Sequence, residues 1–238
     1  MELAGSVVMI VGAGRGIGRA AAQKFAEAGA DLVIASRNEA ELAELEFKLE
    51  RQGARVLSMP TDATKADEVA RLVDEAVNRF GRIDVLIYAA GVGALKPFAE
   101  TSEAEFDKLW ETNAKGAFLV CRAVLPVMEK QKAGRVIAIP GILGKAPMAQ
   151  AAAYCASKYA LTGLLKALAL EYKRSGVRFS LLHLGGVNST FWDAITMRVQ
   201  REKMLSVGAA ADAVFFAAAQ SGEGVLGELV LQPESHQL

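Results

Sequence analysis

The fold is decided by one stretch near the amino terminus, residues 7–18, which reads Val7-Val8-Met9-Ile10-Val11-Gly12-Ala13-Gly14-Arg15-Gly16-Ile17-Gly18. Its first five residues form a continuous apolar run, as expected of a β-strand buried on both faces. The glycines that follow permit a tight turn and let backbone N–H groups approach a phosphate closely. A helix that begins there adds unpaired N–H donors and the positive end of its dipole. The stretch therefore predicts a strand, a phosphate-binding turn and a helix.

Short apolar runs alternate with longer helical patterns along the rest of the chain. We expect strands at 7–11, 31–35, 55–59, 83–89, 135–139, 177–184 and 228–231, and helices at 19–29, 39–51, 65–80, 106–130, 152–174 and 209–220. This alternation predicts an α/β fold, a single domain over residues 1–238 with a doubly wound (Rossmann-type) parallel sheet of about seven strands flanked by helices. Residues 188–207 are expected to form a short helix over the carboxyl edge of the sheet.

The composition excludes several classes of protein. Hydrophobic residues make up 52% of the chain, which excludes a disordered protein. Lys plus Arg and Asp plus Glu both number 27, without the basic excess of a nucleic-acid binder. The sequence has no secretory start, no apolar run of the roughly 18 residues that a membrane span needs, and no metal-ligand spacing. With two cysteines in apolar helical patterns, Cys121 and Cys155, we expect a cytoplasmic protein without nucleic acid, membrane or metal.

Further short motifs follow the glycine-rich turn in a fixed order. They are Asp62 after the third expected strand, Ala90-Gly91 after the fourth, Asn113 in the long helix, Tyr154-xxx-Lys158, and Gly186-Val187 after the sixth strand. With the spacing Gly12-xxx-Gly16-x-Gly18, they resemble the short-chain dehydrogenase/reductase family over essentially the whole chain. The resemblance implies a nicotinamide cofactor bound by Gly12, Arg15, Gly16, Ile17, Gly18, Ser36, Arg37, Asp62, Ala63, Ala90, Gly91, Tyr154, Lys158 and Val187.

Two of these positions have specific family roles. The position of Asp62 contacts adenine in that family, and the position of Val187 lies beside the nicotinamide amide. Asp62 is also a candidate N-cap for the helix at 65–80, and the two roles are compatible.

The end of the second expected strand indicates which nicotinamide cofactor is preferred. An NAD site places a carboxylate there for the ribose 2′-hydroxyl, whereas an NADP site presents arginine to the 2′-phosphate. This chain has Ser36-Arg37 at that point, and Arg15 lies in the glycine turn. Two guanidinium groups can flank a phosphate with charge-assisted hydrogen bonds. The sequence predicts a preference for NADP(H) over NAD(H).

The candidate catalytic residues are Tyr154, Lys158 and Asn113. Tyr154 and Lys158 are four residues apart, so a helix places them on one face. A neighbouring ammonium, helped by a positive oxidised nicotinamide, is expected to lower the tyrosine pKa from about 10. The resemblance implies that Tyr154 gives or takes the substrate proton, that Lys158 also holds the ribose, and that Asn113 positions a water. These roles predict an oxidoreductase that acts on a small-molecule carbonyl or alcohol.

Gly141 departs from the family pattern. The family's active-site serine lies thirteen residues before the tyrosine, where this chain has Gly141, and no serine occurs between Ser102 and Ser157. Losing one oxyanion donor typically costs roughly 10²–10³ in rate. Two functions remain open: an NADP(H)-dependent oxidoreductase weakened by this loss, and a non-catalytic NADP(H)-binding sensor or interaction protein.

Four other features of the sequence bear on the site or on self-association. Tyr88-Ala89-Ala90-Gly91 stands where the family usually has Asn-Asn-Ala-Gly. His183 is expected to pair with a backbone group; the alternative is that it replaces the lost hydroxyl. Phe191 and Trp192 line a substrate pocket or belong to the core. The apolar excess on the helix at 152–174, together with the resemblance, predicts a homodimer or homotetramer.

Overall fold

The computed structural model describes residues 3–195, 197–221 and 224–235. Its strands are β1 (Val7–Val11), β2 (Asp31–Ser36), β3 (Val56–Pro60), β4 (Val85–Tyr88), β5 (Gly134–Ala138), β6 (Val177–Leu184) and β7 (Glu228–Leu231). Its α-helices are α1 (Gly16–Glu27), α2 (Glu39–Arg51), α3 (Ala66–Phe80), α4 (Glu103–Trp110), α5 (Gly116–Gln131), α6 (Ala152–Glu171) and α7 (Val207–Ala219). A π-helical turn, η2 (Glu111–Lys115), joins α4 to α5, and short 3₁₀ helices are η1 (Phe98–Glu100), η3 (Ile142–Gly144), η4 (Thr190–Ala194) and η5 (Arg201–Lys203).

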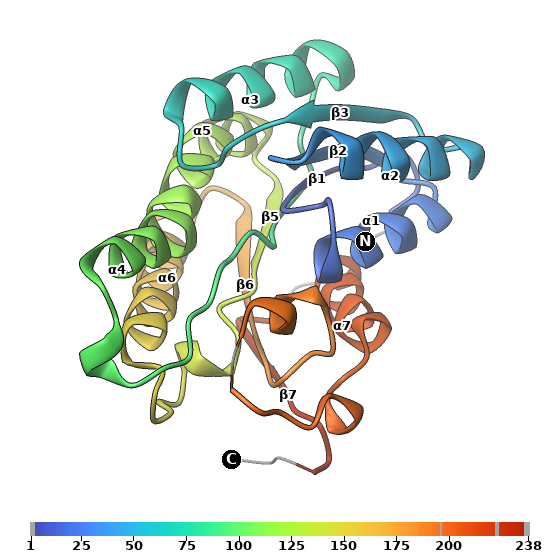
Figure 1. Cartoon of the computed structure of the whole chain (residues 1–238). Coiled ribbons are helices and arrows are strands. Elements are labelled where there is room, and N and C mark those ends of the chain that lie inside the picture. The colour runs from blue at the N-terminus through green and yellow to red at the C-terminus, as the bar shows by residue number, and fades with distance from the viewer. Residues whose placement is uncertain (1–2, 196, 222–223, 236–238) are drawn as a thin grey trace.

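The described strands form one parallel sheet in the order β3-β2-β1-β4-β5-β6-β7. The order reverses direction between β1 and β4, so adjacent crossovers leave a crevice at the carboxyl ends of these strands. Helices cover both faces, with α1, α2 and α7 on one side and α3, α5 and α6 on the other (Figure 1). The predicted fold class, a doubly wound sheet in a single domain, is confirmed.

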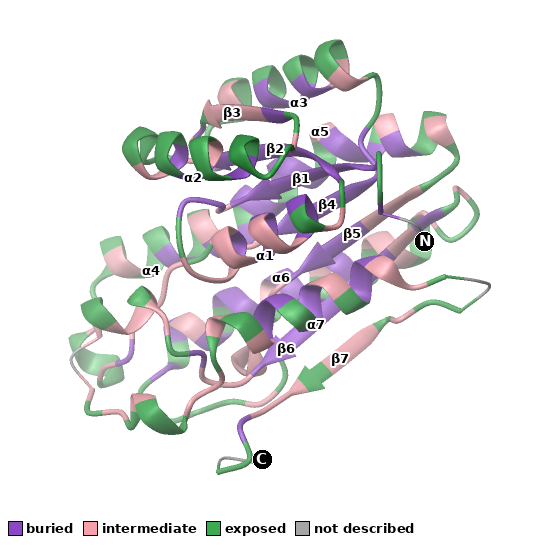
Figure 2. Cartoon of the chain, turned by 90° about the vertical axis from the view of Figure 1, so that its right-hand side faces the viewer, coloured by how far each residue is buried: buried purple, intermediate pink, exposed green. Residues whose placement is uncertain are grey.

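Each face of the sheet has its own apolar core. Residues of β1 alternate between the two cores, because successive side chains of a strand point to opposite faces: Val8 and Ile10 belong to one, and Val7, Met9 and Val11 to the other. Figure 2 shows the central strands buried, whereas β7 at the sheet edge is only partly covered. Burial on both faces explains why the strands read as continuous apolar runs.

Three of the expected segments differ from the structure. The helix expected at 106–130 comprises α4, η2 and α5, which follow one another directly. Helix α1 begins at Gly16 and not at residue 19. Its first turn was not predicted, because that turn contains glycines, which have a low helix propensity. Where one short helix is expected over 188–207, the described residues form η4 and η5, and Val207 begins α7. Across the described residues, no helix combines the length and the apolarity needed to cross a membrane.

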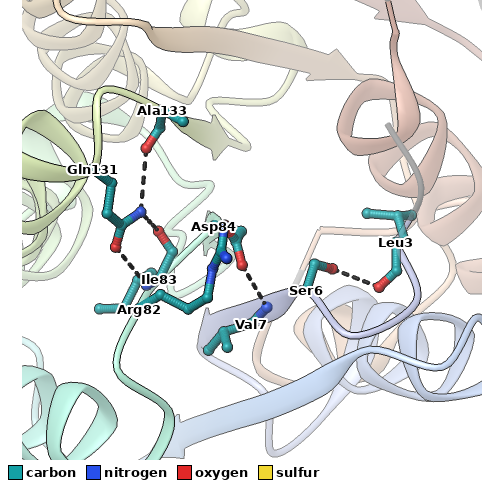
Figure 3. Close-up of polar contacts among 8 residues, drawn as sticks. All are labelled: Leu3, Ser6, Val7, Arg82, Ile83, Asp84, Gln131 and Ala133. Carbon is teal, nitrogen blue, oxygen red and sulfur yellow. Dashed lines mark hydrogen bonds and ion pairs between the residues drawn. The ribbon is translucent and has the colours of Figure 1, made fainter.

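Side chains tie the strands together at their amino ends, away from the cavity described below (Figure 3). The Gln131 side chain accepts a hydrogen bond from Ile83 N at 3.0 Å and donates to Ile83 O at 2.9 Å. Asp84 accepts from Val7 N at 2.9 Å and pairs with Arg82. These contacts fix β1 and β4 next to each other, which positions the turns at their other ends.

Candidate active site

A cavity of about 550 Å³ lies along the carboxyl ends of the strands. It is lined by the last residues of the strands or by those just after them, including Val11, Ser36, Thr61, Ala89, Ile139 and Leu184. Every site residue predicted from the sequence lines it except Gly18 and Asn113, which are buried. The fold therefore brings the predicted residues of several distant segments into one cavity.

The glycine-rich turn fits a phosphate group of a dinucleotide. A Cβ on Gly18 would overlap the Gly12 carbonyl oxygen, so only glycine lets α1 pack this closely on the turn. Gly12 has φ +92 and lies against the backbone of Ala90, where a Cβ would also collide. The turn consequently exposes backbone at the N-terminus of α1, where N–H donors and the helix dipole favour an anion.

One end of the cavity carries most of its charge. Arg15 and Arg37 line this end and are exposed to solvent. Glu41 also lines this end, with its carboxylate beside Ser36 Oγ over Gly14. Glu41 was not predicted as a site residue, although its place three residues after Asn38 was a signal: Asn38 caps α2, and its side chain accepts from Glu41 N at 3.2 Å. A phosphate at this end would meet two guanidinium groups and one carboxylate.

Asp62 lies in a turn after β3 and lines the same end of the cavity. Its Oδ1 accepts from Thr64 N at 3.0 Å and from Thr64 Oγ1 at 2.9 Å. Burial acts to raise the pKa of Asp62, but these hydrogen bonds and the charges of Arg37 and Lys65 give a net lowering. The alternative role as an N-cap is wrong, because Lys65 occupies that position ahead of α3.

Tyr154 and Lys158 lie in the first turns of α6 and line the opposite end of the cavity. Lys158 Nζ lies 5.7 Å from the centroid of the Tyr154 ring and donates to Ile139 O at 3.2 Å. Burial lowers the pKa of Lys158 from 10.5 to about 8. Burial also raises the pKa of Tyr154, so the prediction of a lowered pKa is wrong for the chain by itself. The pKa of Tyr154 is set mainly by the desolvation of its phenol, because the Lys158 ammonium donates to a backbone carbonyl.

Asn113 is fully buried in η2 and joins two parts of the site. Its Nδ2 donates to Val92 O and to Ser157 Oγ, both at 2.9 Å, and its Oδ1 accepts from Val92 N at 2.9 Å. Both amide hydrogens are thus used. A water molecule can therefore bond to this side chain only by donating a hydrogen bond to Oδ1. Ser157 stands within the motif that contains Tyr154 and Lys158 but had no predicted role, because its bond to Asn113 joins residues 44 positions apart.

Tyr88 supports the π-helical turn that carries Asn113. Its hydroxyl donates to Thr112 O at 2.5 Å, and a Cβ on Gly116 would occupy the same space as that hydroxyl. Tyr88 is therefore accommodated by glycine at 116. The Tyr88 hydroxyl is thus bonded to the backbone beside Asn113.

Gly141 has φ +72 and ψ 176, a backbone conformation essentially restricted to glycine. A Cβ there would meet Leu184 O at 3.6 Å, which is ordinary contact, so there is room for a Cβ atom. Gly141 O faces His183 Nδ1 at 3.1 Å, which matches the expected backbone pairing of His183. His183 is buried and is not among the residues that line the cavity, so it does not replace the serine hydroxyl.

Residues 185–187 and 189–192, which follow β6, line the cavity, and η4 is part of the orange segment in Figure 1. Phe191 packs on Tyr154 with 5.9 Å between ring centroids and fills the space over Gly93. Both Phe191 and Trp192 line the cavity, as one of the two alternatives expected. Arg201, missed by the sequence analysis, holds this segment by donating to Asn188 Oδ1 at 2.9 Å and to Ser189 O at 2.9 Å.

Comparison with known proteins agrees with this arrangement. Residues 6–199 match the family described as short chain dehydrogenase. The chain belongs to the short-chain dehydrogenase family. It is 31% identical over 236 residues to a sepiapterin reductase of Chlorobaculum tepidum, with 96% of each chain covered. An L-fucose dehydrogenase of Bos taurus is 34% identical over 193 residues, which cover 81% of this chain and 70% of that one.

Solved structures of this family have the same fold. An alcohol dehydrogenase from the archaeon Thermococcus sibiricus, complexed with 5-hydroxy-NADP, matches with a TM-score of 0.90 and 27% identity over 98% of each chain. A metagenomic short-chain oxidoreductase in complex with NADP matches with a TM-score of 0.85 and 33% identity, covering 98% of this chain and 99% of that one. The family resemblance predicted from the sequence is confirmed.

Lys158 is expected to make the free energy of unfolding rise with pH in the alkaline range. Because burial lowers its folded pKa from 10.5 to about 8, the unfolded chain binds more protons between these values, and stability rises with pH there. Urea unfolding of the wild type and of Lys158→Met at about pH 7, 8.5 and 10 measures this, since Met lacks the titrating group. Relative to Lys158→Met, the wild type should gain up to about 3 kcal/mol. A difference that stays constant with pH would contradict the assignment.

Proposed function

We propose that this protein is an NADP(H)-dependent oxidoreductase that reduces a carbonyl or oxidises an alcohol by hydride transfer. The observation that carries the proposal is the shared cavity: Tyr154 and Lys158 open into the same space as the glycine-rich turn. The relatives named as reductases and dehydrogenases, and the two neighbours that bind NADP or 5-hydroxy-NADP, support it.

Each residue has a defined task in this proposal. The glycine-rich turn and the N-terminus of α1 bind the pyrophosphate. A bound nicotinamide supplies or accepts the hydride. Tyr154 holds the proton that goes to the substrate oxygen, and its raised pKa keeps it protonated as the acid of the reduction. Lys158 binds the ribose, and Asn113 fixes the backbone at Val92 against α6.

A second candidate function is a sensor or interaction protein that binds NADP(H) without catalysis. The feature that favours it is Gly141, because the family resemblance aligns this glycine with an active-site serine that would help to bind the substrate oxygen. A panel of ketones and aldehydes, assayed by consumption of NADPH, separates the two. Turnover of any panel member supports the oxidoreductase, whereas NADPH binding without turnover of any member supports the sensor.

We also infer a preference for NADP(H), which two variants at the charged end of the cavity test. Arg37→Ala should weaken NADPH binding by about tenfold or more, because a charge-assisted hydrogen bond is lost, and should leave NADH binding nearly unchanged. Glu41→Gln should strengthen NADPH binding by up to about fivefold, because a carboxylate beside the 2′-phosphate is removed. Fluorescence titration of both reduced cofactors measures these effects. Tighter binding of NADH than NADPH by the wild type would contradict the preference.

Self-association into a homodimer or homotetramer is the expected state of the chain in solution. Large apolar side chains are exposed on neighbouring helices of one side: Phe106 and Trp110 on α4, Phe118 on α5 and Leu170 on α6. Apolar patches of this kind favour burial against a partner. Light scattering at micromolar concentration should give a mass of two or four chains, and a monomer would contradict this prediction.

The buried state of both cysteines supports the cytoplasmic location expected from the sequence. Cys121 and Cys155 are free and buried, so neither forms a disulfide with the other. Burial raises the pKa of the Cys121 thiol to about 12, which keeps it protonated and unreactive. Unpaired thiols are typical of proteins in reducing compartments.

A further inference from the structure

The two ends of the cavity differ in charge. Four of the charged lining residues, Arg15, Arg37, Glu41 and Asp62, lie on the turns that follow β1, β2 and β3 or at the start of α2. Among the described residues that line the other end, the one charged side chain is Lys158, and its Nζ already donates to Ile139 O. A cofactor with several phosphates is suited to the first end, and a ligand without charge to the second.

Apolar and aromatic side chains form the walls of the second end, which we call the substrate end. They are Leu95, Ile142, Met148, Tyr154, Phe191 and Trp192. Phe191 and Trp192 meet edge to face, with 5.3 Å between centroids, and Phe191 also packs on Tyr154. The indole Nε1 donates to Val187 O at 2.9 Å, so Trp192 has no N–H left for a ligand. Such walls gain energy by contact with an apolar or aromatic group.

The lysines on neighbouring segments do not compensate for this lack of charge. Lys96 Nζ pairs with Glu105 at 2.6 Å, and Lys145 Nζ pairs with Glu228 at 2.8 Å. Neither lysine lines the cavity. Lys158 is the one cation among the described residues that line this end, and in the proposed function its ammonium binds the cofactor ribose. A carboxylate or phosphate on a substrate would therefore lose its hydration here without a further cation to pair with, which is unfavourable.

We propose that the substrate is an uncharged carbonyl compound, or the corresponding alcohol, with an apolar and preferably aryl group next to the reacting carbon. The aryl group lies among Leu95, Met148, Phe191 and Trp192, and the carbonyl oxygen faces Tyr154. This inference rests on the proposed function and specifies its substrate class.

Met148 offers a direct test because it lies at the rim, 40% exposed, so a change there leaves the core intact. Its loop runs beside Leu95, since Lys96 N donates to Gln150 O at 2.8 Å. We would compare acetophenone with 4-acetylbenzoate, which carry the same ketone without and with a carboxylate. Both are assayed with NADPH for the wild type, Met148→Lys and the neutral control Met148→Gln. The ratio of kcat/KM values is then compared between variants, so that the intrinsic reactivity of each ketone cancels.

The wild type should prefer acetophenone by about tenfold or more. Met148→Lys should narrow this ratio by about 3- to 10-fold, because it places a cation at the rim, and Met148→Gln should leave the ratio near its wild-type value. A wild-type enzyme that uses 4-acetylbenzoate as well as acetophenone, or a ratio that Lys and Gln change equally, would overturn the proposal.

Calorimetric binding to the NADP-loaded protein separates this proposal from the proposed function. If neither ketone is reduced, tighter binding of acetophenone than of 4-acetylbenzoate still supports the charge selectivity of the substrate end. The proposed hydride transfer is then the part that is wrong. Equal binding, or no binding of either to a protein that holds NADP, overturns the substrate class while cofactor binding stands.

Discussion

Tyr154→Phe is expected to lower kcat by about 10²- to 10⁴-fold, because the substrate oxygen loses its proton donor. The Kd for NADPH should change little, since the phenylalanine ring keeps the packing on Phe191. Steady-state kinetics with any accepted ketone and a fluorescence titration of NADPH measure the two quantities.

Tyr159→Phe is the matched control for this variant. Tyr159 lies on the same helix, and its hydroxyl donates to Lys145 O at 2.6 Å, outside the cavity. Removing that hydroxyl should leave kcat near the wild-type value. If Tyr154→Phe keeps more than about half of the wild-type kcat, another group donates the proton and the role of Tyr154 is wrong.

Gly141→Ser is expected to have opposite effects on stability and on rate. The backbone at φ +72 and ψ 176 strains any residue with a Cβ, at a cost of about 1–3 kcal/mol in the free energy of unfolding. In the proposed function, the serine hydroxyl would supply a donor near the substrate oxygen, and kcat should then rise by up to about 10²-fold. Urea unfolding and steady-state kinetics measure the two effects.

Gly141→Ala separates the backbone effect from the hydroxyl. It carries the same Cβ and should show the same loss of stability, without the gain in rate. Adding Tyr154→Phe to Gly141→Ser should abolish the gain, because the proton donor is then missing. Equal rates for the serine and alanine variants would contradict the account of an enzyme weakened by Gly141.

Local sequence patterns predicted most of the fold. Buried parallel strands such as β1 read as unbroken apolar runs, and α3 shows the spacing of an amphipathic helix, so both follow from neighbouring residues. The chain order of these elements then limits the sheet to a few topologies. The π-helical turn at Asn113 was not predictable in this way, because it depends on Tyr88, which lies on another element.

The parts of the candidate site that could be predicted are those whose function depends on residue type and on spacing along the chain. The glycine-rich turn and the pair Tyr154 and Lys158 are of this kind. The role of Glu41 depends on its approach to Gly14 and Ser36, and the direction of the Tyr154 pKa depends on burial. Both are properties of packing between distant segments, which a single sequence does not display.

The central claim, hydride transfer with Tyr154 as the acid, is tested most directly by isotope transfer. NADPH deuterated at the transferred position is mixed with the protein and an aryl ketone, and the alcohol is analysed by mass spectrometry. We expect one deuterium on the carbinol carbon of the product formed by the wild type, and a loss of nearly all labelled product with Tyr154→Phe. NADPH that binds tightly while no deuterium enters the product of any ketone or aldehyde in the panel would contradict the claim.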